Sequence, residues 1–187
     1  GGWVFSAACI GMALAWAYSA PPFRLKRNGW WGNSAVGACY EGLPWFTGAA
    51  VMAATLPDTK IILIAALYSI GAHGIMTLND FKSIDGDRQM GLKSLPAMLG
   101  TDKAARLACW VMGIPQVVVI GLLIYWGAPL FGALVAAVLT VQIYLMFQLL
   151  ESPREKAPWY NATGISLYVS GMMASAFALQ NLLDGGL

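Results

Sequence analysis

The chain has 187 residues, of which 58% are hydrophobic and only 11% are charged. A soluble domain carries about a quarter charged residues, so this composition excludes an ordinary soluble protein and indicates an integral membrane protein. The net charge of +2 is too small to indicate a nucleic-acid-binding protein, and the basic residues do not form the patch that such a protein presents. The three cysteines have no paired spacing and are typical of small buried side chains rather than of a disulfide framework or a zinc site.

Six apolar runs follow one another, each of about 20 residues, the length that a helix needs to cross a hydrocarbon core of about 30 Å. Glycine and other small residues recur in these runs, as is typical of helices that pack closely in a membrane. The sequence therefore predicts an all-α integral membrane bundle, with a single domain over residues 1–187. The expected spans are residues 1–19, 34–55, 60–78, 104–125, 128–149 and 161–183.

The basic residues lie on alternate connections between these runs. The first, third and fifth connections hold nine of the eleven lysines and arginines, and Arg106 lies just beyond the third, so ten fall on one side, whereas the second contributes only Lys60 and the fourth holds none. By the positive-inside rule these three connections lie in the cytoplasm, and Gly1 lies on the other side. A chain made in the cytoplasm begins most simply inside, so we expect further spans to precede Gly1.

A polar stretch after the third run, residues 78–100, interrupts the apolar pattern, and we call it the charged segment. If the third helix continues past residue 79, Asp80 and Asp87 return to nearly the same face, because seven residues make about two turns. Asp85 is rotated well away from that face. Carboxylates suit Mg²⁺, which binds one or two of them together with the phosphate oxygens of a substrate. The candidate metal ligands are Asp80, Asp85 and Asp87.

The charged segment also carries cations that suit a phosphate group. Arg88 can form a bidentate fork and Lys93 can act as a point charge, so both could neutralise a departing diphosphate. Asn79, the polar residue in front of the first carboxylate, is a further candidate for substrate binding. The alternative is a solvated loop in which the acids and bases pair with one another.

A second basic stretch lies between the first two runs, in residues 18–33, and we call it the basic loop. Its two prolines end the first span, because proline lacks the donor that a helix needs. Arg24, Lys26 and Arg27 then follow at the membrane surface. One interpretation is anchorage to anionic headgroups, with the two tryptophans of the loop as an aromatic belt. The other is a phosphate clamp that faces the charged segment.

Three motifs in chain order resemble those of a known family: YSAPPFRLKRNGWWGN in the basic loop, GLPWF at residues 42–46, and NDFKSIDGDRQMGLKSLP in the charged segment. Together, and across the whole chain, they resemble the UbiA superfamily of intramembrane prenyltransferases. The likeness is strongest to the chlorophyll and bacteriochlorophyll synthases, and within these to the bacteriochlorophyll branch. The resemblance implies nine transmembrane helices around a central cavity, with two aspartate-rich motifs on cytoplasmic loops that bind Mg²⁺ and a prenyl diphosphate.

The resemblance also implies roles for residues of this chain. The charged segment resembles the second aspartate-rich motif, in which Asp80 and Asp87 match family carboxylates, Asp85 matches an acidic position and Lys93 matches a basic position. Asp80, Asp87 and Lys93 are therefore the catalytic candidates. The basic loop resembles the part of the family fold that faces the diphosphate. The candidate substrate-binding residues are Tyr18, Arg24, Lys26, Asn79 and Arg88.

The chain departs from the family pattern in two places. Many relatives carry a carboxylate where this chain has Ser83, and no aspartate precedes Gly42, so the first aspartate-rich motif is absent. The six spans resemble the last six of nine. We therefore expect that this chain lacks the first three helices of the family fold, in agreement with the charge pattern, and that it holds only half of the metal site.

The function that the resemblance implies is Mg²⁺-dependent transfer of a geranylgeranyl or phytyl group from its diphosphate to the propionate carboxylate of a chlorophyllide or bacteriochlorophyllide. One alternative is a prenyltransferase of the same family that acts on a quinone precursor or on haem. An alternative of another class is a non-catalytic pigment-binding scaffold or a transporter. The expected partners are the prenyl diphosphate, the pigment and membrane lipid, with photosynthetic assembly partners left open. The expected location is a bacterial inner, photosynthetic membrane.

Among the polar residues inside the apolar runs, His73 and Glu41 each have a functional and a structural interpretation. His73, the only histidine, is either an axial ligand to the central Mg of a chlorin or a partner in an interhelical hydrogen bond. Glu41 is either a functional group or the structural hydrogen-bonding partner of another span.

Overall fold

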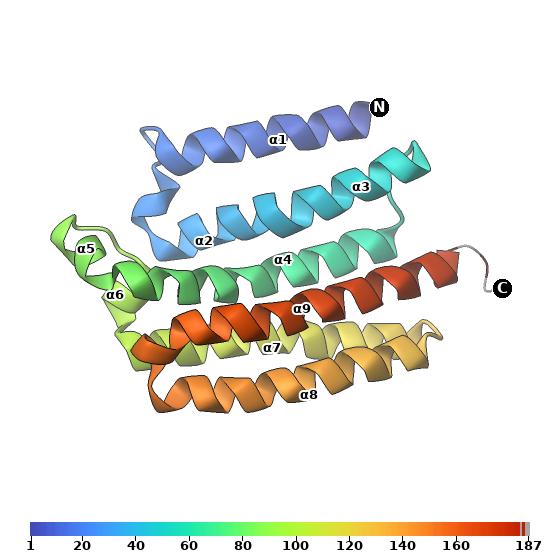
Figure 1. The fold of residues 1–187 in the computed structure, drawn as a ribbon. Coiled ribbons are helices and arrows are strands. Elements are labelled where there is room, and N and C mark those ends of the chain that lie inside the picture. The colour runs from blue at the N-terminus through green and yellow to red at the C-terminus, as the bar shows by residue number, and fades with distance from the viewer. Residues whose placement is uncertain (184, 186–187) are drawn as a thin grey trace.

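A computed structural model describes residues 1–183 and 185, in which helices are joined by short turns and no strand occurs (Figure 1). Five of the helices, α1, α4, α7, α8 and α9, are long and apolar enough to cross a membrane. This confirms the predicted all-α membrane bundle. The α-helices are α1 (Gly2–Ser19), α2 (Gly29–Gly37), α3 (Leu43–Ala53), α4 (Thr59–Asn79), α5 (Ile84–Gln89), α6 (Leu95–Leu99), α7 (Thr101–Tyr125), α8 (Pro129–Glu151) and α9 (Pro153–Leu183).

The second expected span is built from three consecutive segments instead of one α-helix. A π-helical turn, Ala38–Gly42, joins α2 to α3 without a break in the helical chain. The span starts at Gly29, five residues earlier than residue 34, because the side chain of Asn28 caps it by accepting a hydrogen bond from the Trp30 amide at 2.9 Å. It ends at Ala53, since Ala54 has a positive φ of 56°.

The last span also begins earlier than expected, at Pro153 instead of residue 161. Proline is well suited to the first position of a helix, where its missing N–H has no intrahelical partner to lose. Glu155 in the first turn adds a favourable interaction with the helix dipole. The apolar run therefore underestimates the helix, which carries its charged first turns beyond the apolar part.

Helix α4 is the centre of the bundle and packs against α2, α7 and α9. Small residues let these helices approach closely: a Cβ on Gly74 would lie 2.6 Å from the Ala108 carbonyl oxygen of α7. The Tyr168 hydroxyl of α9 donates to the Tyr68 carbonyl of α4 at 2.7 Å. By contrast, α1 buries only Ala7 and is apolar on all sides, so its packing is sparse.

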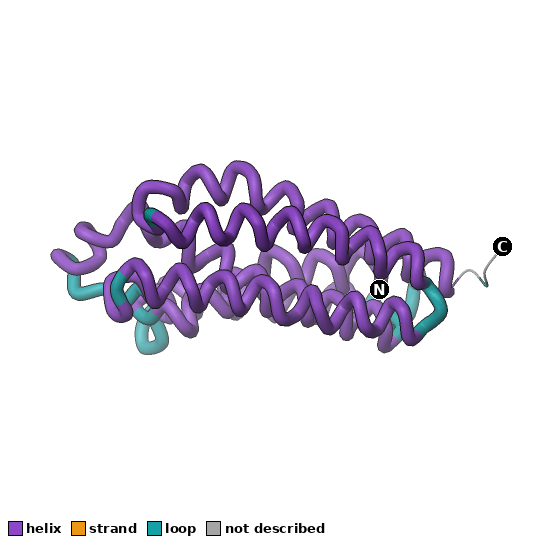
Figure 2. Tube along the Cα trace, turned by 90° about the horizontal axis from the view of Figure 1, so that it is seen from below, coloured by secondary structure: helices purple, strands orange, loops and turns teal. Residues whose placement is uncertain are grey.

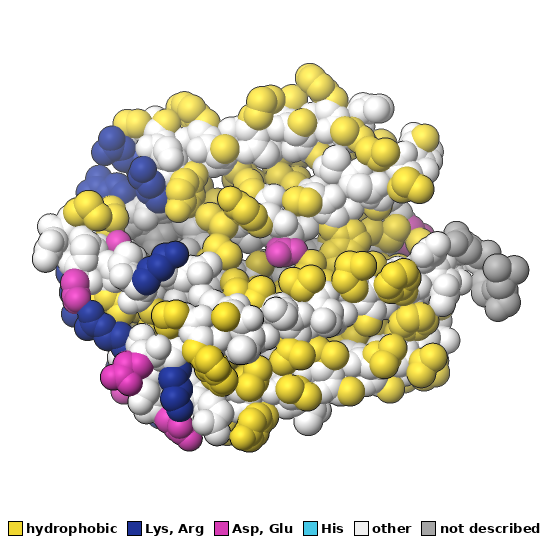
Figure 3. Space-filling model, in the orientation of Figure 1, with side chains coloured by type: hydrophobic (Ala, Val, Ile, Leu, Met, Phe, Trp, Pro, Cys, Tyr) yellow, Lys and Arg dark blue, Asp and Glu magenta, His cyan; other side chains and the backbone are white. Residues whose placement is uncertain are grey.

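Successive spans run in opposite directions, so the first, third and fifth connections meet at one end of the bundle, where α5 and α6 lie (Figures 1 and 2). Charged side chains gather at this end, and the visible face of the helices is largely hydrophobic (Figure 3). The bundle thus brings the basic loop and the charged segment together although the apolar second and third spans separate them in sequence.

Candidate functional site

The basic loop is held against the charged segment by backbone hydrogen bonds. The Gly29 amide donates to the Lys93 carbonyl at 2.7 Å, and the Lys93 amide donates to the Arg27 carbonyl at 2.9 Å. The contact requires glycine at position 29, because a Cβ there would lie 2.6 Å from the backbone nitrogen of Leu95. The two loops therefore form one wall at the charged end of the bundle.

Two of the three aspartates of the charged segment face this wall. Helix α4 continues into a 3₁₀ turn, Asp80–Ser83, and then into α5, which is the condition under which the seven-residue spacing places Asp80 and Asp87 on nearly the same face. The Ser83 hydroxyl lies 3.0 Å from a carboxylate oxygen of Asp87 and 3.1 Å from the Asp80 carbonyl oxygen, both of which can accept its hydrogen. Asp87 is only 8% exposed. Ser83 therefore ties the two acidic residues into one unit.

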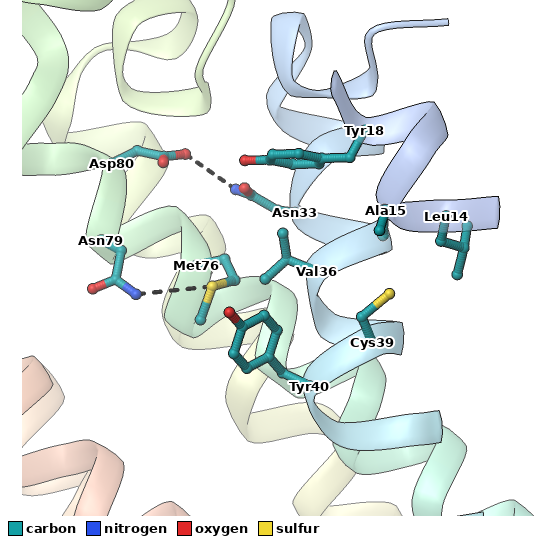
Figure 4. Close-up of a pocket in the computed structure, with 11 residues that line it drawn as sticks. Leu14, Ala15, Tyr18, Asn33, Val36, Cys39, Tyr40, Met76, Asn79 and Asp80 are labelled. Atoms are coloured by element: carbon teal, nitrogen blue, oxygen red, sulfur yellow. Dashed lines mark hydrogen bonds between the residues drawn. The ribbon is translucent and has the colours of Figure 1, made fainter. Parts of the chain in front are cut away.

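Asn33 of α2 reaches this unit from the other side. Its amide donates to a carboxylate oxygen of Asp80 at 3.2 Å and lies 3.4 Å from the hydroxyl of Thr77. Figure 4 shows the Tyr18 side chain of α1 with its hydroxyl directed toward this pair. Three helices, α1, α2 and α4, thus supply polar groups around one carboxylate.

Two cavities meet at these residues. A polar chamber of about 170 Å³ lies between the basic loop and the charged segment and includes Lys26, Ser83 and Asp87 in its lining. An apolar cleft of about 560 Å³ extends from it between α1, α2 and α4 (Figure 4). Both cavities are lined by Tyr18, Asn33 and Asp80. The arrangement suits an amphiphile with a polar head in the chamber and a long apolar chain in the cleft.

The carboxylates of the chamber suit a cation. Asp80 lies just past Leu78, where the apolar run ends, and its pKa is raised to about 6, mainly because the carboxyl is buried. The negative charge of Asp87 also raises this pKa, whereas the hydrogen bond from Asn33 and the charge of Lys82 lower it. Neither carboxylate forms an ion pair within the part of the chain that the structure describes. Two carboxylates without an ion-pair partner at one chamber form a hard-oxygen donor set that fits a divalent metal.

Comparison with known proteins gives the chain its family. The model of the UbiA prenyltransferase family matches residues 1–174. The chain belongs to the UbiA prenyltransferase family. Members of this prenyltransferase family use a divalent metal, in agreement with the donor set of the chamber.

Curated relatives of the chain include bacteriochlorophyll and chlorophyll synthases. The chain is 56% identical over 182 residues to the bacteriochlorophyll synthase 33 kDa chain of Cereibacter sphaeroides, which covers 97% of this chain and 60% of that protein. It is 46% identical to the bacteriochlorophyll synthase 34 kDa chain of Chloroflexus aurantiacus, in a match that covers 91% of this chain and 54% of that protein. It is 39% identical to the chloroplastic chlorophyll synthase of Arabidopsis thaliana, in a match that covers 95% of this chain and 46% of that protein. The chain thus spans about 60% of the length of the first of these relatives. No solved structure matches it.

Not every acidic residue expected at the UbiA-type site lies there. Asp85 is 63% exposed at its side chain and forms an ion pair with Arg154 at the start of α9. The described residues contain no group of three or more His, Cys, Asp or Glu side chains placed to hold a metal. The structure therefore brings together Asp80 and Asp87 and leaves Asp85 outside, which differs from the expected three-carboxylate set.

Of the basic residues expected at the site, one lines the polar chamber and the others do not. Lys26 lines the polar chamber. Arg24, Arg88 and Lys93 are exposed and line neither the chamber nor the cleft. Lys93 instead contributes through its backbone, whose hydrogen bonds join the charged segment to the basic loop.

Asn79 lines the apolar cleft, as a substrate-binding candidate should, but it also connects two helices. Its side-chain oxygen accepts a hydrogen bond of 2.8 Å from the Asn161 amide of α9, and its amide lies 3.8 Å from the sulfur of Met76. Sequence reasoning gave no role to Asn161 and none to Asn33. The only signal for Asn33 was its place at the end of the basic-loop motif.

His73 and Glu41 remain apart from the site. His73 is 7% exposed, lies with its ring 5.7 Å from that of Trp30, and has no hydrogen-bond partner on either nitrogen among the described residues. Glu41 is half-buried in the π turn. Neither lines the chamber or the cleft.

Proposed function

We propose that the complete protein containing this chain esterifies a chlorophyllide-type pigment, preferably bacteriochlorophyllide, with the prenyl group of geranylgeranyl or phytyl diphosphate. The observation that supports the prenyl donor is the junction of a polar chamber with an apolar cleft at Asp80. The pigment acceptor rests on the names of the relatives described above, which are bacteriochlorophyll and chlorophyll synthases.

The chamber suits the diphosphate. Asp80 and Asp87 would hold Mg²⁺ there, and a bound Mg²⁺ stabilises negative charge on the leaving diphosphate oxygens. Lys26 provides a further positive charge in the lining. Asp85 has no part in this proposal, because its ion pair with Arg154 lies outside the chamber.

The chain's own residues orient the acidic pair. Asn33 fixes one carboxylate oxygen of Asp80 by a hydrogen bond, which leaves the other oxygen for a cation. Ser83 does the same for Asp87. Ligands that are held in place by such neighbours need less reorganisation when the metal binds.

The apolar cleft holds the prenyl chain and limits the access of water to its reactive end. Leu14, Val36 and Met76 line it together with the aromatic rings of Tyr18 and Tyr40. The allylic C–O bond breaks with its electron pair on the diphosphate, and an oxygen of the pigment's propionate forms the new bond to the allylic carbon. The products are the ester and free diphosphate, so the reaction needs no redox partner.

The protein is an integral membrane protein, and we propose that its charged end faces the cytoplasm of a bacterial inner, photosynthetic membrane. Ten of the eleven basic residues lie at this end, in the connections or in the adjoining ends of α7 and α9, as the positive-inside rule expects of the cytoplasmic side.

The proposal is tested in membranes that contain the complete reading frame of which this chain is part. Geranylgeranyl diphosphate and Mg²⁺ are supplied with bacteriochlorophyllide, a quinone precursor and haem in competition, and the prenylated product is identified by mass. An Asp80→Asn variant is run in parallel. We expect the pigment ester from the parent protein and at least a 100-fold lower yield from the variant, consistent with the loss of several kcal/mol of metal-derived stabilisation.

Other products would change the proposal in defined ways. A prenylated quinone precursor or a prenylated haem would contradict the pigment acceptor and retain the prenyl donor. Pigment that binds without forming any ester would favour a non-catalytic scaffold. An Asp80→Asn variant as active as the parent protein would contradict the assignment of the chamber.

A further inference from the structure

A second elongated groove lies on the outer face of α7 and α8, away from the polar chamber. It has a volume of about 500 Å³, and its lining is apolar except for Arg106 at one end. None of its lining residues belongs to the chamber or to the apolar cleft. The groove is therefore a separate feature that the proposed reaction does not use.

The groove has the length of one bilayer leaflet. On α7 it runs from Arg106 to Val118 and on α8 from Leu139 to Leu150, about 16 to 18 Å along each helix at a rise of 1.5 Å per residue. Half of a hydrocarbon core measures about 15 Å. Since the helices are antiparallel, Leu150 at the charged end of α8 matches Arg106 near the charged start of α7.

The floor of the groove is open because small residues form part of it. A Cβ added at Gly113 would meet no atom within 4 Å, and Cys109 lies one turn before it. Trp110 and Phe147 also line the groove and are 68% and 67% exposed. An extended hydrocarbon chain in the groove can pack against these two aromatic residues.

The charged end of the groove favours an anion. Arg106 and Lys103 lie three residues apart on one side of α7, and both are exposed. Neither forms an ion pair within the described part of the chain, where the nearby Glu151 of α8 pairs with Lys156 instead. Basic pockets at the end of membrane helices bind the headgroups of anionic lipids, and arginine suits phosphate in particular.

We propose that this groove is a binding site for one anionic phospholipid of the leaflet at the charged end of the bundle. An acyl chain lies in the groove between α7 and α8, and the lipid phosphate is bound by Arg106, with Lys103 as a second cation. The single-leaflet length excludes a molecule that spans the bilayer, and the positive end disfavours a lipid without net negative charge.

The test measures retained lipid by native mass spectrometry of the complete protein, after exchange into mixed micelles with equal amounts of phosphatidylglycerol and phosphatidylcholine. We expect one phosphatidylglycerol to be retained about five times more often than phosphatidylcholine, the preference that one membrane-surface cation supplies. Arg106→Gln should remove this preference. Gly113→Leu should lower the retention of both lipids, because its side chain fills the groove.

A matched control is available on the same helix. A Cβ added at Gly121 would also meet no atom within 4 Å, but Gly121 lies outside the groove, so Gly121→Leu should retain lipid as the parent does. Equal retention of the two lipids by the parent protein, or unchanged retention in both Arg106→Gln and Gly113→Leu, would overturn the proposal. Preferential retention of added geranylgeranyl diphosphate, or a dimer that dissociates only in Gly113→Leu, would assign the groove to another occupant and overturn it as well.

Discussion

Asp85 and Asp87 lie two residues apart in the same short helix, yet their surroundings are opposite. Asp87 is buried, accepts a hydrogen bond from Ser83 and lines the polar chamber. Asp85 is exposed and paired with Arg154. Two residues along a helix correspond to a rotation of about 200°, so neighbours of this kind cannot face the same cavity. Closeness in an acidic motif therefore does not establish a shared role.

The two sites also differ in the free energy of their electrostatic interactions. An exposed ion pair contributes at most about 1 kcal/mol, because water and salt screen it. Two carboxylates at one half-buried chamber repel each other and lose hydration, so the chamber is stabilised by a bound cation. We expect substitutions on the chamber side to change the reaction strongly and those on the exposed side to change it little.

The largest effect is expected for Asp80→Asn. The amide is nearly isosteric with the carboxylate but cannot supply the negative charge that holds the metal. The rate of ester formation should fall by at least about 100-fold, since metal binding contributes several kcal/mol and each 1.4 kcal/mol is a factor of ten. Initial rates in membranes of the complete protein measure this. Activity above about a third of the parent rate would show that Asp80 is not a metal ligand.

A smaller effect is expected for Asn33→Ala, which removes the hydrogen bond to Asp80 and keeps the carboxylate. Loss of a group that orients a metal ligand typically costs between about 10- and 100-fold in metal affinity or activity. The effect should appear as a higher Mg²⁺ concentration for half-maximal rate. Asn161→Ala, which removes the bond to Asn79, is the matched control and should leave the Mg²⁺ dependence unchanged. A drop in rate without a change in Mg²⁺ dependence would count against the orienting role.

Substitutions of Lys26 and Arg88 should also differ in their effect on binding of the prenyl diphosphate. Lys26 lines the chamber and Arg88 does not. Lys26→Gln should raise the KM for the prenyl diphosphate about ten-fold, because one charge-assisted hydrogen bond contributes about 1.5 to 3 kcal/mol. Arg88→Gln should change that KM less than three-fold. The reverse order in a steady-state titration would place the diphosphate nearer to Arg88.

The smallest effect is expected for Asp85→Asn. The variant loses only an exposed ion pair, so activity should change less than about three-fold, and thermal stability should change by no more than about 1 kcal/mol. Both are measured on the same preparation, activity by initial rates and stability by thermal unfolding in detergent. A loss of activity comparable to that of Asp80→Asn would show that all three acids act together.

Local features of this site were predictable from the sequence. The apolar runs predicted the membrane helices, and the seven-residue spacing predicted that Asp80 and Asp87 share a face from which Asp85 is turned away. The start of α9 was missed, although its end was predicted, because Pro153 and the charged residues after it extend the helix beyond the apolar run. The π turn in the second span has no signal in the hydropathy pattern.

Contacts between distant segments were not predictable. Asn33 and Asp80 are 47 residues apart, and Asp85 and Arg154 are 69 residues apart. Both pairs depend on which spans are neighbours and on how far each is rotated, and neither property follows from apolar length. The same holds for Lys93, whose charge suggested phosphate binding but whose backbone makes the defined contacts.

The central claim is that Asp80 and Asp87, without Asp85, hold a divalent metal with the diphosphate. Binding of Mn²⁺ in place of Mg²⁺ tests it most directly, measured by electron paramagnetic resonance on the complete protein with inorganic diphosphate present. Asp80→Asn and Asp87→Asn should each release most of the bound Mn²⁺, whereas Asp85→Asn should bind it as the parent does. Equal loss in all three variants, or loss in Asp85→Asn alone, would contradict the account.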